Sequence, residues 1–93
     1  MPPDTYKQLI WDYHISPSEF DSILSGQKTF GSLNQAWAIS RVLENVNYYD
    51  AIQMVSLDTI KNNWLEVKPK LFKKAIRNGY EFVLQRHALS HTR

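Results

Sequence analysis

Helix-start signals recur at short intervals along this 93-residue chain and limit what it can fold into. The clearest lies in "ISPSEF", where Ser16 can cap a helix and Pro17 can take its first position. Glu19 stands three residues after Ser16, as a capping box requires. The segment therefore predicts a helix over about residues 17–25.

Similar signals follow at Ser32 with Gln35, at Asn47 with Asp50, at Ser56 and at Pro69. Apolar residues recur at helical spacing after each of them, whereas strand-like alternation is confined to a short run near Trp11. We predict an all-α fold, a compact single-domain bundle of six or seven short helices spanning 1–93, with a frayed C-terminal tail from about residue 89. The helices are expected near residues 5–13, 17–25, 33–46, 48–55, 57–67, 69–79 and 80–90.

Composition supports one globular domain and excludes several kinds of site. Hydrophobic residues make up 43% of the chain, enough apolar surface to offset the conformational entropy lost on folding. Cysteine is missing, which rules out disulfides, thiolate zinc sites and cysteine nucleophiles. No apolar run approaches the roughly 20 residues that cross a bilayer. We expect a cytoplasmic protein that does not bind membranes.

The segment "GQKTFGSL" has the glycine spacing of a phosphate-binding loop, at Gly26 and Gly31. Such a loop also needs a preceding strand and a Gly-Lys-Ser/Thr sequence, so that lysine reaches the phosphates and the hydroxyl holds magnesium. Here Gly31 is followed by Ser32, and the preceding residues are predicted to be helical. We interpret the segment as the end of one helix and the start of the next.

Charge is divided unevenly along the chain. Residues 1–60 carry three lysines and arginines against seven acidic residues, a net charge of −4, and residues 61–93 carry eight against two, a net charge of +6. In a helix starting at Pro69, four cations would fall within an arc of about 100°. They are Lys70, Lys73, Lys74 and Arg77, opposite Leu71, Phe72, Ala75 and Ile76. This basic face is either a solvated surface or a docking surface for an acidic protein or for phosphates.

Trp37 lies off the centre of the apolar stripe of its predicted helix, near Arg41 and Glu44. Two interpretations remain open. The helix is covered on two sides, so that Trp37 is buried, or Trp37 and Arg41 form part of an interface, where both residue types are favoured.

The sequence shows no assembled catalytic or metal site. His87 and His91 are four residues apart, but no further ligands complete a zinc site. His14 has no nucleophile or paired acid in a recognisable context. We therefore predict that the protein is not an enzyme and has neither a metal nor a cofactor. The segment 51–64 resembles a helix-turn-helix motif only loosely, which leaves specific DNA binding by Lys61 and its neighbours as a weaker alternative.

Three segments, "LIWDY", "WAISRVLENVNYYDAI" and "PKLFKKAIRNGYEFV", together span about residues 9–84. They resemble small helical bacterial proteins, mostly of unassigned function, encoded beside nucleotidyltransferase-type toxins of abortive-infection systems. The shared pattern is an apolar-Trp-Asp start, an Arg-Val-Leu-Glu helix at 41–44 and a late basic helix. The resemblance implies an antitoxin-like or adaptor role through protein contacts.

The leading hypothesis is a non-catalytic protein-interaction module of a bacterial cell, antitoxin-like in role. It would bind a partner protein through Lys70, Lys73, Lys74 and Arg77, with Trp37 and Arg41 contributing. The alternative is a nucleic-acid-binding helical protein that uses the same basic face. Neither hypothesis specifies an oligomeric state.

Overall fold

The computed structural model describes residues 15–29 and 31–91. These residues form six α-helices and one short 3₁₀ helix without a β-strand, as the all-α prediction requires. The predicted helix near residues 5–13, Trp11 and His14 lie outside the described residues. In chain order the helices are α2 (Pro17–Leu24), α3 (Gln35–Asn45), α4 (Tyr48–Met54), α5 (Leu57–Asn62), α6 (Trp64–Val67), η1 (Lys68–Lys70) and α7 (Lys74–His91).

Helix α2 begins at the predicted capping box. The Ser16 hydroxyl accepts a hydrogen bond from the Glu19 N–H, and the Glu19 carboxylate accepts one from the Ser16 N–H, at 3.1 and 2.9 Å. The bond from the Ser16 backbone lowers the pKa of Glu19, because it favours the charged carboxylate. Gly26 follows the helix with φ +83°, a conformation that favours glycine.

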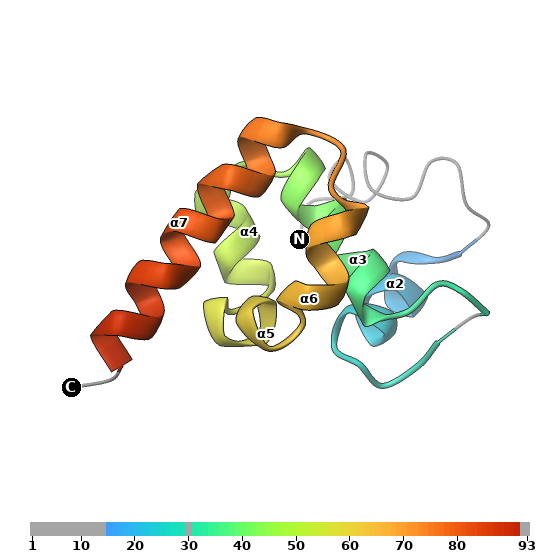
Figure 1. Cartoon of the computed structure of the whole chain (residues 1–93). Helices are drawn as coiled ribbons and strands as arrows, with labels where there is room; N and C mark the ends of the chain where they lie inside the picture. The colour runs from blue at the N-terminus through green and yellow to red at the C-terminus, as the bar shows by residue number, and fades with distance from the viewer. Residues whose placement is uncertain (1–14, 30, 92–93) are drawn as a thin grey trace.

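Helix α3 lies at the centre of the molecule and packs against α2, α4, α6 and η1 (Figure 1). Its side chains are buried around most of its circumference, which is expected of a helix covered on more than one side. Trp37 is 9% exposed and meets Phe20 edge to face, with ring centroids 5.8 Å apart. The interpretation of α3 as a helix covered on two sides is therefore correct.

The predicted cap of α3 at Ser32 is wrong by two residues. Asn34 caps the helix instead, and its side chain accepts the Trp37 N–H at 3.0 Å. Gln35 does not complete a capping box with Ser32. Its side-chain amide donates to the Leu24 carbonyl at 3.1 Å, and this bond gives a hydrogen-bond partner to a carbonyl group at the C-terminal end of α2.

The caps of α4 and α5 are those predicted, Asn47 and Ser56, which accept the N–H groups of Asp50 and Thr59. The single helix expected over 57–67 is broken at Asn63, however. The Asn63 side chain donates to the Thr59 carbonyl at 2.9 Å, and its backbone leaves the helical region at ψ 7°. Asparagine competes in this way for backbone groups that would otherwise continue the helix.

The helix predicted to start at Pro69 and stop at Gly79 is wrong at both ends. Pro69 lies in the short η1, Leu71 is extended with ψ 120°, and α7 begins only at Lys74. Helix α7 then continues through Gly79, because Tyr80 and Leu84 beyond it are buried against the core. The frayed tail expected from about residue 89 would fall within the last turn of α7 and stays a prediction.

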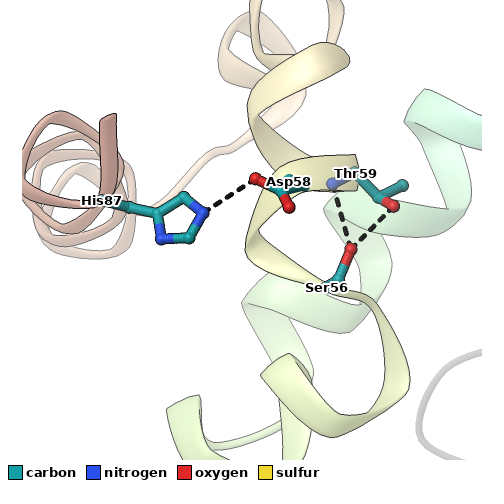
Figure 2. A network of polar contacts seen from close by, with 4 residues as sticks. All are labelled: Ser56, Asp58, Thr59 and His87. Carbon is teal, nitrogen blue, oxygen red and sulfur yellow. Dashed lines mark hydrogen bonds and ion pairs between the residues drawn. The ribbon is translucent and has the colours of Figure 1, made fainter. Parts of the chain in front are cut away.

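Helix α7 runs along the side of the molecule opposite α2 (Figure 1). Polar side-chain contacts with preceding elements help to hold it. Lys68 contacts Glu81 at 2.9 Å, and the His87 ring nitrogen Nε2 lies 2.8 Å from the Asp58 carboxylate of α5. Figure 2 shows the His87 side chain pointing from α7 toward Asp58, beside the Ser56 cap of α5.

Candidate docking site

A groove of about 380 Å³ opens between α3 and the segment that joins η1 to α7. Its lining mixes aromatic, cationic and polar side chains from both elements. The lining residues are Trp37, Ser40, Arg41, Glu44, Asn45, Lys70, Phe72 and Lys73. Three of them are cations and one is an acid.

Glu44, near the end of α3, joins the two walls of the groove. Its two carboxylate oxygens accept the backbone N–H groups of Phe72 and Lys73, at 3.1 and 3.2 Å. The Lys73 ammonium donates in return to the Glu44 backbone carbonyl at 3.4 Å. The carboxylate thus binds the chain immediately before α7 and 28 or 29 residues away in sequence.

Phe72 is the most exposed large hydrophobic residue of the groove, at 93%, whereas its neighbour Leu71 is 3% exposed. The extended backbone at Leu71 explains the contrast, because successive side chains of an extended segment point in opposite directions. Phe72 was predicted to lie on the apolar side of a helix, opposite the cations, and this prediction is wrong. The adjacent pair Leu71 and Phe72 would have indicated its exposure if the segment had been taken as extended.

Four of the six predicted site residues line the groove: Trp37, Arg41, Lys70 and Lys73. Lys70 lies in η1 and Lys73 precedes α7, so the predicted single helical face does not exist. Lys74 and Arg77 lie on the first turn of α7 and are not among the lining residues. Phe72 and the role of Glu44 were not predicted from the sequence, and no local pattern provides a signal for the role of Glu44.

The floor of the groove is built by buried parts of α3. The Ser40 side chain is 5% exposed and its hydroxyl donates to the Trp37 carbonyl at 2.6 Å, so this polar group is already satisfied. Arg41 is half-buried, whereas Lys70 and Lys73 are exposed on the opposite wall. The cations are therefore placed where they can meet an anion that enters the groove.

A second hollow of about 450 Å³ lies among α2, α3, α4 and α5. Several of its polar groups are paired within the protein. Gln35 donates to Leu24, and the hydroxyls of Ser56 and Thr59 are 2.9 Å apart. This hollow presents no cation, so it lacks the charge that distinguishes the first groove.

Two buried polar atoms have no hydrogen-bond partner in the part of the chain that the structure describes, the Tyr80 hydroxyl and Trp64 Nε1. Burial raises the pKa of Tyr80 to about 12, and the neighbouring Tyr48 contributes in the same direction. The two tyrosine rings lie 5.8 Å apart between α4 and α7. Neither Tyr80 nor Trp64 lines the groove.

Within residues 15–29 and 31–91, no group of three or more histidine or acidic side chains could hold a metal ion. None of the described helices combines the length and the apolar character needed to span a membrane. No family model, curated protein or solved structure matches the chain.

Proposed function

We propose that this protein is a non-catalytic interaction module that docks an acidic segment of a partner protein at the groove between α3 and the start of α7. The observation that carries the proposal is the position of Phe72, 93% exposed beside a groove with Arg41, Lys70 and Lys73 in its walls. Such a site would bind carboxylates through the cations and an apolar side chain through Phe72.

An exposed aromatic residue alone means little, because single apolar residues are common on protein surfaces. Phe72 differs because its backbone is held by Glu44 and its neighbour Leu71 is anchored in the core. Aromatic and arginine side chains are favoured at the centres of protein interfaces. A side chain presented on an already ordered backbone also loses less entropy on binding.

One feature favours a protein partner over nucleic acid. Leu65 on α6, the helix that leads into η1, is 91% exposed and would suit the apolar surface of a protein. An antitoxin-like role in the bacterial cytoplasm, as the sequence resemblance implies, makes a nucleotidyltransferase-type toxin the first natural partner to test.

A defined peptide tests the proposal directly. We would titrate the isotope-labelled protein with a short peptide in which aspartates flank a central leucine, and follow backbone amide NMR signals. We expect saturable shifts at residues 37–45 and 70–73 that weaken as salt rises, because exposed charges are screened. The same peptide with asparagine in place of aspartate should leave these signals unchanged. Equal shifts with both peptides, or none with either, would contradict the proposal.

Charge reversal provides the matched control. Lys70→Glu combined with Lys73→Glu should abolish binding of the aspartate peptide. Lys28→Glu combined with Lys61→Glu changes the net charge equally, but these exposed lysines do not line the groove, so binding should persist. Loss of binding in both double variants would show that net charge, not the groove, attracts the peptide.

The nucleic-acid alternative uses the same samples with single-stranded and duplex oligonucleotides. At about 0.15 M salt we expect negligible binding, since the groove offers too few phosphate contacts to hold nucleic acid there. Oligonucleotide binding tighter than peptide binding, with a log-log salt slope of about −0.9 per phosphate contact on duplex DNA, would replace the protein-docking proposal.

A further inference from the structure

We infer that Glu44 is a positioning residue of this docking site, and that it strengthens binding of an acidic ligand although it carries a negative charge itself. The inference rests on the proposed function and deepens it. It assigns to Glu44 the ordering of Phe72 and Lys73, the two side chains that the connection between η1 and α7 contributes to the groove wall.

The backbone at Phe72 is held on both sides. On one side, Leu71 is buried at 3% exposure, and its N–H donates to the Lys68 carbonyl at 3.2 Å. On the other side, the Glu44 carboxylate binds the Phe72 and Lys73 N–H groups with separate oxygens. Hydrogen bonds to a charged acceptor are stronger than those between neutral groups.

Few other contacts can hold this short segment. It lies between η1 and α7, and its N–H groups at Phe72 and Lys73 donate to Glu44 and not within a helix. The Lys73 carbonyl accepts the Arg77 N–H of α7 at 3.1 Å, and the Phe72 side chain is almost fully in solvent. Without Glu44, the only described contacts at Phe72 and Lys73 would be those of the neighbouring Leu71 and of α7. The two residues would then sample several conformations, and a ligand would have to order them on binding.

The charge of Glu44 should affect the affinity for an acidic peptide in the opposite direction to its ordering role. Removing an acid from a groove that contains three cations should, by charge alone, tighten binding of an anionic peptide. Positioning predicts weaker binding after the same substitution. The direction of the change in affinity therefore decides between the two roles.

The test compares Glu44→Ala, Glu44→Gln and Glu66→Ala. Glutamine keeps one acceptor oxygen without the charge, and Glu66 is an exposed acid of α6 that does not line the groove. For each variant we would measure hydrogen exchange of the Phe72 and Lys73 amides and the affinity for the aspartate peptide.

We expect Glu44→Ala to speed exchange of both amides and to weaken peptide binding on the order of tenfold, because the ligand must then order the segment. Glu44→Gln should restore part of the exchange protection and part of the affinity. Glu66→Ala should leave the exchange of both amides unchanged and should not weaken binding.

Each contrary result points to a different error. A folded Glu44→Ala protein that binds the peptide as tightly as the unmodified protein, or more tightly, overturns the positioning role and leaves the docking proposal intact. Unchanged amide exchange in that variant also overturns it. If Glu44→Ala fails to fold, Glu44→Gln decides by the same criteria. If the unmodified protein does not bind the peptide, the docking proposal fails, and amide exchange alone decides whether Glu44 orders the segment.

Discussion

The chain before α7 and the distal half of α7 each contact a carboxylate of another helix, but through different donors. Before α7, Glu44 accepts two backbone N–H groups, at Phe72 and Lys73. In the distal half, Asp58 pairs with the imidazole of His87 at 2.8 Å. A backbone N–H is present whatever the side chain, whereas the second contact exists only while residue 87 can supply a polar ring nitrogen.

The two contacts therefore differ in whether they tolerate a change of side chain. The two backbone bonds to the Glu44 carboxylate do not depend on the side chains at 72 and 73, although the Lys73 ammonium contact with the Glu44 carbonyl does. These side chains can therefore serve in binding while the backbone stays in place. The contact with Asp58, in contrast, depends on the side chain at position 87. The region before α7 is therefore the one suited to a variable recognition surface.

The largest expected effect is on the free energy of unfolding, when Leu84 of the distal half is compared with Phe72 before α7. Leu84 in the distal half is 5% exposed, and Leu84→Ala should lower the free energy of unfolding by about 3 kcal/mol through lost burial and a cavity. Phe72→Ala should change it little, because Phe72 is 93% exposed. Urea unfolding of both variants measures the contrast. Equal losses would mean that Phe72 also contributes to the core and is not a free recognition residue.

Tyr80, midway along α7, should respond to the loss of a single oxygen atom. Its buried hydroxyl has no partner among the described residues, so Tyr80→Phe should raise the free energy of unfolding by about 1 kcal/mol. Thermal and urea unfolding near neutral pH measure this gain. A clear loss of stability would show that the hydroxyl has a partner after all.

The same residue predicts an alkaline limit to stability. The folded pKa of Tyr80 is raised from 10.0 to about 12, so the unfolded chain loses its proton first. The free energy of unfolding is therefore independent of this group below pH 10 and falls as pH rises from 10 through about 12. Unfolding followed across this range should show a decline that is smaller in Tyr80→Phe. An identical decline in both proteins would mean that other groups cause it.

A smaller gain is expected from Gly79, in the middle of the first half of α7. It is exposed, and a Cβ built there meets nothing within 4 Å. Gly79→Ala should stabilise the protein by about 0.5 to 1 kcal/mol, since alanine restricts the unfolded chain and favours the helix. Gly26→Ala is the control and should destabilise, because Gly26 has φ +83°. A loss of stability in Gly79→Ala would indicate that the helix needs glycine there.

The smallest effect should come from loss of the contact between His87 and Asp58. Asp58 is largely exposed, and exposed ion pairs contribute about 0 to 1 kcal/mol. His87→Ala should therefore lower global stability by about 0.5 kcal/mol at most, while amide exchange accelerates in the distal turns of α7. Exchange at Phe72 and Lys73 should stay the same. Faster exchange at both places would show that the two regions open together.

Local signals predicted the parts of the fold that local contacts determine. The caps at Ser16, Asn47 and Ser56 each bond to a backbone group three residues away, and the sequence identified all three. The helix ends at Pro69 and Gly79 were predicted wrongly, because distant contacts decide them. The sequence shows neither the bonds from Glu44 nor the burial of Tyr80 and Leu84.

The candidate site was predicted in part for the same reason. The residue types that favour an interface can be read from the sequence, and four of the six predicted residues do line the groove: Trp37, Arg41, Lys70 and Lys73. Their arrangement follows from the extended backbone at Leu71, which no short motif encodes. Phe72 was placed in the core because its apolar character was combined with a helical period that the segment does not adopt.

The packing of the helices also sets an order in which the molecule can assemble. The contacts of α3 with α2 and α4, and of α5 with α6, join neighbours in the chain, and such local contacts form early in folding. The groove needs Arg41 and Glu44 from α3 together with residues 70–73, so it is completed only when the later part of the chain has docked. A chain that has not yet placed residues 70–73 against α3 cannot display this surface. A ligand that recognises the groove would therefore distinguish the finished protein from its nascent forms.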